Sequence, residues 1–126
     1  MNFPANLKYT KDHEWLRTEG DVGFVGITDY AQGELGDVVF VELPKPGTRV
    51  EQGKSFGTIE AVKAVSDLYA PVSGEVLEVN KEAQDTPEVV NKEPYERGWL
   101  VKLRLSNKAE AGQLLDVDAY KKLIAK

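Results

Sequence analysis

Short apolar runs alternate with clusters of turn-forming residues along most of the chain. Runs rich in β-branched and aromatic residues, bounded by Gly, Pro, Asn or Asp, are typical of β-strands. The pattern predicts strands at 14–16, 22–27, 38–41, 75–79 and 99–105. The first two are joined by a predicted hairpin turn over 18–21. The prolines in 44–47 exclude a central strand there, because proline has no backbone N–H to donate.

Helical signals occur at two places. Thr28-Asp29 is suited to cap a helix that runs to about Leu35 and stops at Gly36. Apolar residues recur at helical spacing over about 116–125, with Asp116 as the cap and lysines toward the end. Many short strands with a few peripheral helices predict a β-rich α+β domain.

An internal repeat divides the chain. A shift of 38 residues places 36–54 on 74–92, with five identities in nineteen positions. Self-similarity at a fixed offset indicates repeated structural units. We therefore expect one domain over 1–126 that contains two similar β units, at about 36–60 and 74–105.

The segment between the two units, TIEAVKAVSDLYAP (58–71), gives conflicting signals. Its apolar residues repeat every three positions, and Ala, Glu and Lys favour a helix, so local propensity predicts one. Its position, after a turn and before a proline, favours two strands that close one unit onto the other. We expect a hairpin over 58–69, with Lys63 at its tip and the carboxylates of Glu60 and Asp67 on either side.

Charge and composition exclude several classes of protein. The 126 residues carry 16 basic and 21 acidic side chains, a net charge of −5, so nucleic acid is not an expected partner. No apolar run approaches the ~20 residues of a membrane-spanning helix, so no membrane partner is expected. The first residues have neither the basic nor the apolar segment of a signal peptide. A bacterial cytoplasmic protein is expected, or a mitochondrial matrix protein if a presequence was removed.

The chain lacks most of the side chains that perform difficult chemistry. It has no cysteine, a single histidine (His13), and no nucleotide-binding or metalloprotease motif. We therefore expect no metal site and no catalytic activity, unless the chain carries a group that supplies the chemistry. His13 is expected to be structural, and Trp15, Phe40 and Trp99 are expected in the core.

Seven motifs occur in order along the chain. They are YTKDHEW (9–15), VGITDYAQ (25–32), LGDVV (35–39), IEAVKA (59–64), YAPVSGEV (69–76), VNK (90–92) and GWL (98–100). Together they resemble the H protein of the glycine cleavage system, from about Leu7 to Ile124. The family commonly has serine where this chain has Ala61, and a small residue where it has Val65. The resemblance implies a lipoyl-type flattened β-barrel or sandwich with a pseudo-two-fold axis.

The resemblance also implies a cofactor and partners. Lys63 would carry lipoate in amide linkage, and the chain would be a shuttle that makes no bond itself. A pyridoxal-phosphate glycine decarboxylase would load an aminomethyl group onto a lipoyl sulfur, a tetrahydrofolate-dependent aminomethyltransferase would take the one-carbon unit, and dihydrolipoyl dehydrogenase would reoxidise the dithiol. A lipoate ligase or lipoyl transferase would attach the arm. Without cysteine, no protein thiol competes with that dithiol in exchange.

Four carboxylates gain candidate roles from the resemblance. Glu60 would guide the enzyme that attaches lipoate, or would only keep the tip soluble. Asp12, Glu14 and Asp67 would line a cleft that holds the loaded arm and its cationic amine, although a plain cross-strand ion pair is the alternative for Glu14. At about 4 Å, a carboxylate–ammonium pair is worth roughly 1 kcal/mol in water and about 4 kcal/mol at an effective dielectric near 20.

Related carriers are the competing hypotheses. Biotin carrier domains typically flank the modified lysine with methionines, whereas Lys63 lies between Val62 and Ala64, and the only methionine is Met1. Lipoyl domains of the oxo-acid dehydrogenase complexes usually have Asp directly before the lysine, where this chain has Val62. A lipoyl relay donor for other lipoate-dependent complexes is an alternative role that the residues do not separate from the shuttle.

Overall fold

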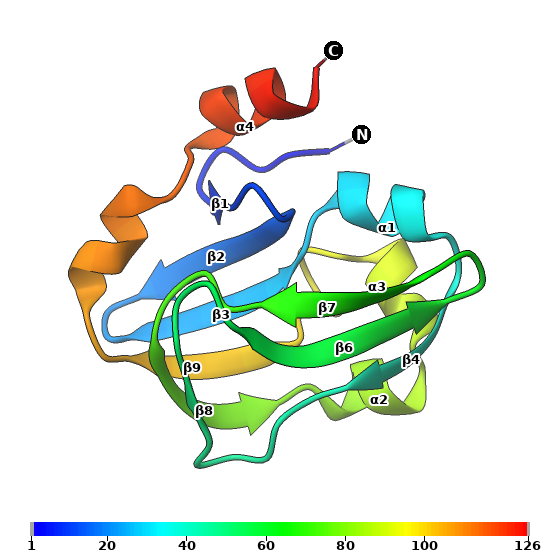
Figure 1. Ribbon diagram of the computed structural model, residues 1–126, viewed down its shortest axis with the longest axis horizontal. Helices are drawn as coiled ribbons and strands as arrows, with labels where there is room; N and C mark the ends of the chain where they lie inside the picture. Colours follow the sequence, from blue (N-terminus) through cyan, green and yellow to red (C-terminus); the bar gives the residue numbers. More distant parts are fainter. Residues whose placement is uncertain (1, 126) are drawn as a thin grey trace.

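The computed structural model describes residues 2–125, which form nine strands in two sheets with short helices around them (Figure 1). The larger sheet has the strand order β1-β2-β3-β9-β8-β5, and the smaller has the order β4-β6-β7. All strand pairs are antiparallel. Neither sheet closes on itself, so the molecule is a flattened sandwich. The β-rich α+β prediction is confirmed.

The elements have the following bounds. The larger sheet consists of β1 (Lys8–Tyr9), β2 (Glu14–Glu19), β3 (Val22–Ile27), β5 (Arg49–Val50), β8 (Gly74–Val79) and β9 (Val101–Leu105). The smaller sheet consists of β4 (Val38–Glu42), β6 (Ser55–Ala61) and β7 (Val65–Tyr69). The helices are α1 (Asp29–Leu35), α2 (Lys81–Asp85), α3 (Glu88–Lys92), a 3₁₀ helix (Lys108–Gln113) and α4 (Val117–Ile124). No helix in the described part of the chain is long and apolar enough to cross a bilayer.

The segment 58–71 forms most of a β-hairpin and contains no helix. Glu60 lies opposite Val65, and the Ala61 N–H donates to the Ala64 carbonyl at 2.8 Å. In a strand, alternate side chains point to opposite faces, so a hairpin with one buried face has a fixed register. The local sequence pattern of 58–71 is also compatible with a helix, but burial of one face on the larger sheet selects the hairpin.

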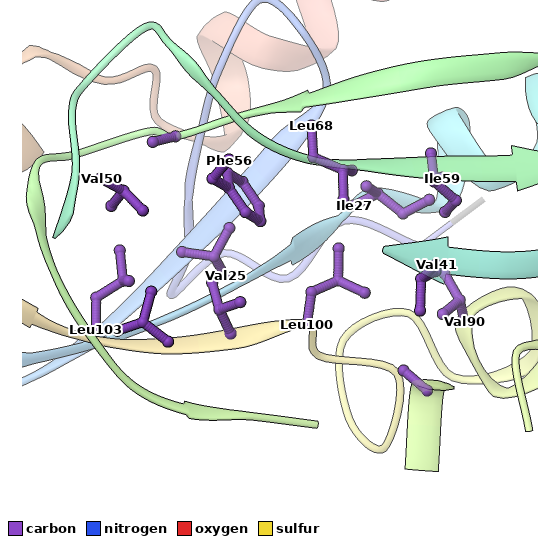
Figure 2. Close-up of a cluster of buried hydrophobic side chains, with 14 of the residues drawn as sticks. Val25, Ile27, Val41, Val50, Phe56, Ile59, Leu68, Val90, Leu100 and Leu103 are labelled. Atoms are coloured by element: carbon purple, nitrogen blue, oxygen red, sulfur yellow. The ribbon is translucent and has the colours of Figure 1, made fainter. Parts of the chain in front are cut away.

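The two sheets pack face to face around one apolar core (Figure 2). Ile59 and Leu68 of the smaller sheet point into the space between the sheets, as do Val25 and Leu103 of the larger sheet, and each is at most 1% exposed. Full burial of such a side chain contributes about 1.5–3 kcal/mol. This layer therefore holds the hairpin firmly onto the larger sheet.

A cluster of aromatic residues attaches α4 to the larger sheet. Tyr120 of α4 stacks on Tyr9 with ring centroids 4.7 Å apart, and both residues are fully buried together with Trp15. The Tyr120 hydroxyl lies 2.8 Å from Thr28 Oγ1 and 2.8 Å from His13 Nδ1. The C-terminal helix is thus tied to the beginning of α1 and to the residues that lead into β2.

Thr28 begins α1, as the sequence predicts, and its buried hydroxyl has two partners. Thr28 Oγ1 accepts from the Ala31 N–H at 3.2 Å and lies 2.8 Å from Tyr120 Oη. Thr28→Val keeps the shape but removes both hydrogen bonds, so it is expected to lower the free energy of unfolding by about 1–2 kcal/mol, measured in urea. Thr18→Val, at an exposed position of β2, is the matched control and should cost less than about 0.5 kcal/mol. Equal losses would contradict the capping role.

The two segments related by the 38-residue shift share one strand and then diverge. β4 and β8 occupy corresponding positions, but the first segment continues into a turn and β5, whereas the second continues into α2 and α3. No helix was expected over 81–92. Each of these helices has five residues, which is too short for helical periodicity to be recognised in the sequence.

Phe40 is exposed, which corrects the expectation that it lies in the core. Trp15 is fully buried and Trp99 packs, half-buried, against the aromatic cluster, but Phe40 is 48% exposed. A register shift between β4 and β6 at Val39 leaves both Val39 and Phe40 on the surface. Because a bulge adds a residue to one strand only, it breaks the alternation from which burial was predicted.

Candidate functional site

Lys63 lies exposed at the tip of the β6–β7 hairpin. The Val62 N–H donates to the Asp37 carbonyl at 2.9 Å, so the tip is tied to the residue before β4. Among residues 2–125, His13 is the one non-glycine residue with a positive φ. The connection at Val62-Lys63 is therefore not one of the primed turns that require Gly or Asn, which explains why no such residue marks the tip.

The aliphatic stem of Lys63 rests on Gly36. A methyl group on Gly36 would lie 3.3 Å from Cγ, Cδ and Cε of Lys63. Gly36 also ends α1 with a φ of 82°, a conformation that residues with side chains rarely adopt. Gly36 therefore ends the helix and makes room for the lysine stem, while Lys63 remains exposed.

A cavity of about 170 Å³ opens between β7, α1 and the start of β2. Residues that line it include Asp12, Glu14, Ile27, Leu35, Ser66 and Asp67. Ser66 follows Lys63 by three residues along the hairpin, so the two residues are at most about 10 Å apart. A second cavity, of about 270 Å³, also contacts Asp12 and Glu14. The lysine tip and the acid-lined cavity are thus neighbours.

Glu14 is the buried carboxyl of the site, 2% exposed. Its Oε1 accepts from the Thr10 hydroxyl at 2.8 Å, and its Oε2 accepts from the Tyr69 N–H at 3.2 Å. Burial raises the pKa of Glu14 from 4.5 to about 8, the two hydrogen bonds oppose the rise, and nearby Asp12 adds to it. Glu14 has no cation within 4 Å in the described structure, so the expected alternative of a cross-strand ion pair does not occur. At neutral pH the carboxyl is mostly protonated, and a cation placed beside it would favour its ionised form, with the proton lost to solvent.

Asp12 and Asp67 border the cavity in different ways. Asp12 is exposed at the rim, where its N–H donates to Thr10 Oγ1 at 3.2 Å. Asp67 lies opposite Thr58, on the same face as Glu60, and its Oδ1 accepts from the Ser55 hydroxyl at 3.4 Å. The register therefore places the Asp67 side chain on the outer face of the smaller sheet, although the residue borders the cavity.

Glu60 lies on the outer face of the smaller sheet, away from the cavity. It is exposed between Phe40 of β4 and Val65 of β7. Glu60 precedes Lys63 by three residues, so an enzyme that approaches the tip from the outside meets both side chains. Glu60 and Glu14 are thus on opposite sides of the hairpin.

His13 is held by hydrogen bonding and aromatic contacts. Its ring lies 4.8 Å from the Tyr30 ring, and its backbone has a φ of 72°. Burial lowers the pKa of His13, with Asp12 and Glu34 acting in the opposite direction. A neutral imidazole bonded to Tyr120 has a structural role, in keeping with the interpretation of the sequence.

Sequence reasoning missed Thr10, which holds the Glu14 carboxyl, and Ser66, a residue of β7 on the cavity side. Alternation along β7 was a usable signal for Ser66, because Leu68 shares its face and is an obvious core residue. Thr10 carried no such signal. Its contact with Glu14 depends on an irregular segment between β1 and β2.

Comparisons with known proteins agree over nearly the whole chain. The family model described as Glycine cleavage H-protein matches residues 7–126. A glycine cleavage system H protein of Bacteroides thetaiotaomicron is 55% identical over 124 residues, 98% of this chain and 98% of that protein. One of Symbiobacterium thermophilum is 57% identical over 119 residues, 94% of this chain and 93% of that protein.

The fold agrees as well. The crystal structure of a glycine cleavage system H protein from Mycobacterium marinum matches with a TM-score of 0.88 at 41% identity, and the match covers 95% of this chain and 97% of that one. Sequence and structure thus point to the same family along nearly the full length. The chain belongs to the glycine cleavage H-protein family.

Proposed function

We propose that this chain is the lipoyl-carrying shuttle of a glycine cleavage system, with lipoate joined in amide linkage to Lys63. The observation that carries the proposal is an exposed lysine at the tip of a well-anchored hairpin, beside an acid-lined cavity, in a chain of this family. Lipoate would supply two sulfurs that accept and release the aminomethyl cargo and then undergo redox exchange. The chain supplies the attachment point, the shelter and the charges, and works as a carrier subunit and not as an enzyme.

The geometry of the tip suits a modified lysine. A lysine stem lengthened by a medium-chain acid can span the separation of at most about 10 Å between Lys63 and the part of β7 at the cavity. The tip is held by the Ala61–Ala64 and Val62–Asp37 hydrogen bonds, so the attachment point has little freedom of its own. A fixed base and a long side chain confine the cargo to a small volume, which raises its effective concentration at a docked enzyme.

The acids of the site match the charge of an amine cargo. Amide formation removes the charge of Lys63, which is the sole cationic side chain within 58–71. The buried Glu14 carboxyl lies in the neighbouring cavity with no cation of its own, and a cationic amine placed there would favour its ionised form. Asp12 at the rim would add to the attraction, whereas Asp67 would act from the outer face.

Glu60, exposed three residues before Lys63, is the proposed recognition element for a lipoate ligase or lipoyl transferase. The loading, unloading and reoxidising partners are the glycine decarboxylase, the aminomethyltransferase and dihydrolipoyl dehydrogenase. The reported relatives are bacterial, which supports a bacterial cytoplasm as the setting.

The test is the intact mass of the chain produced in cells that make lipoate, followed by peptide mapping. We expect one lipoyl increment, on the peptide that contains Lys63. Production in cells that lack the attaching enzymes is the control and should give the unmodified mass. A biotinyl increment, a lipoyl group on another lysine, or no modification beside a competent ligase would refute the proposal.

A further inference from the structure

The large apolar side chains that are exposed gather beside the hairpin tip. Five such residues are exposed in the described part of the chain, and four of them are Val39, Phe40, Val62 and Val65, which are 48–72% exposed. The fifth, Leu123, belongs to α4, which packs on β1. Scattered single apolar residues are normal on a surface, but adjacent ones with a polar border are typical of interaction sites.

The register places these residues in rows across the smaller sheet. Phe40, Glu60 and Val65 form one row on the outer face, because Phe40 pairs with Glu60 and Glu60 pairs with Val65. Glu42, Thr58 and Asp67 form the next row. The bulge at Val39 adds one more apolar side chain at the edge. We call this surface the β4–β6–β7 face, made of Val39, Phe40, Glu42, Thr58, Glu60, Val65 and Asp67.

The charge of the β4–β6–β7 face has one sign. Strands β4, β6 and β7 contain the carboxylates Glu42, Glu60 and Asp67 and no lysine or arginine. All three carboxylates are exposed, and none has a cation within 4 Å among residues 2–125. The larger sheet differs, since its strands carry both acids and bases, such as Glu75 and Arg104 in contact with each other.

We propose that the β4–β6–β7 face is the docking surface for the enzymes that act on the group at Lys63, and that these enzymes offer an apolar contact bordered by lysine and arginine. The inference rests on the proposed function, because it takes Lys63 as the attachment point. Val62, next to Lys63, joins this face to the tip. An enzyme seated here has the modified lysine at the edge of its contact, while the cavity on the other side of the hairpin stays uncovered.

A second copy of this chain fits the face poorly. A symmetric dimer places the same patch on both subunits, so Glu42, Glu60 and Asp67 would face their own copies. Such a contact brings like charges together and loses the hydration of six carboxylates without pairing them. A basic partner pairs them instead.

The size of the face indicates a short-lived contact. Three strands of about five residues cover roughly 17 by 15 Å, or about 250 Å², well below the ~800 Å² that each partner buries in a stable complex. A shuttle has to leave each enzyme once its cargo has been transferred. Weak apolar contact with electrostatic attraction provides a fast approach and a fast release.

The test compares lipoylated variants as substrates of each purified enzyme component. Phe40→Ser/Val65→Ser is expected to raise the KM for the lipoylated chain about 10-fold with at least one component, at unchanged kcat. Glu42→Lys is expected to raise the same KM and to weaken its dependence on salt. Leu123→Ser, which removes an exposed apolar residue far from the face, is the matched control and should leave KM unchanged.

Two further readouts separate docking from other causes. Reduction of the arm by a small phosphine and the thermal midpoint of unfolding should be the same in all variants, because neither depends on docking. If the lipoylated double variant has the same KM as the lipoylated native sequence with every component, the docking surface is refuted, but the shuttle function is not. If the lipoylated native sequence is not a substrate for any component, the proposed function is refuted, and this inference is refuted with it.

Discussion

Lys63→Arg is expected to abolish lipoylation, and with it all carrier activity, while the fold stays intact. Arginine keeps the positive charge and a stem of similar length, but its guanidinium has no free primary amine for amide formation. Lys63 is exposed, its side chain makes no hydrogen bond or ion pair within residues 2–125, and its stem touches Gly36. The free energy of unfolding should therefore change by less than about 0.5 kcal/mol.

Three measurements check this expectation: intact mass after production with a lipoate ligase, glycine decarboxylation in a reconstituted system, and thermal unfolding. Lys54→Arg is the matched control, since Lys54 is an exposed lysine at the other end of β6, paired with Glu51 at 3.3 Å. It should retain the lipoyl increment and full activity. Activity of Lys63→Arg above the level without any carrier would show that another residue bears the arm.

Glu14→Gln is expected to change the pH dependence of stability. The pKa of Glu14 is about 8 in the folded chain and near 4.5 when exposed, so between these values the folded state holds a proton that the unfolded state has lost. The stability from the neutral carboxyl is complete below about pH 4.5 and is lost as the pH rises through about 8. Glutamine keeps the shape and stays neutral, so the variant should be more stable than the native sequence by about 4 kcal/mol at pH 8 and similar to it at pH 4.5.

The same substitution should release the cargo sooner. A glutamine amide cannot provide the negative charge that a buried ammonium group requires, and a charge-assisted hydrogen bond is worth about 1.5–3 kcal/mol. The lifetime of the amine-loaded form should therefore fall roughly 10- to 100-fold, as followed by mass spectrometry after removal of the decarboxylase. Binding of a small amine cargo would thus depend on the residue that destabilises the empty chain at alkaline pH.

Glu19→Gln is the control for both effects, because Glu19 lies at the far end of β2 with an exposed carboxylate paired to Arg17. It should follow the native sequence at every pH and leave the lifetime of the loaded form unchanged. If Glu14→Gln retained the native slope of stability against pH, the assigned protonation of Glu14 would be wrong. If only the lifetime were unchanged, Glu14 would be excluded as a ligand of the amine.

Local patterns predicted most of the strands, together with the start of α1 at Thr28 and of α4 at Asp116, because each depends on residues close together in the sequence. They left the hairpin at Lys63 undecided against a helix, since its turn uses ordinary backbone angles and needs no glycine. The internal repeat and the position of the segment resolved that ambiguity, and burial of Ile59 and Leu68 is the physical reason.

The site was harder to predict than the fold. Glu14 lines the cavity, but its protonation state depends on Thr10 and Tyr69, of which Tyr69 is 55 residues away. Contacts at such separation cannot be read from spacing along the chain. The face on which Asp67 lies was also hard to predict, because a shift of one residue along a strand moves a side chain from the inner to the outer face.

The hydrogen bond from the Tyr69 N–H to Glu14 also bears on self-association. β7 is an edge strand of the smaller sheet, and an open edge offers unpaired N–H and C=O groups that can add a strand from another molecule. The carboxyl of Glu14, reaching across from the larger sheet, occupies one of these donors at 3.2 Å. One of the donors that β7 could offer to an added strand is thereby taken by the same side chain that lines the cavity.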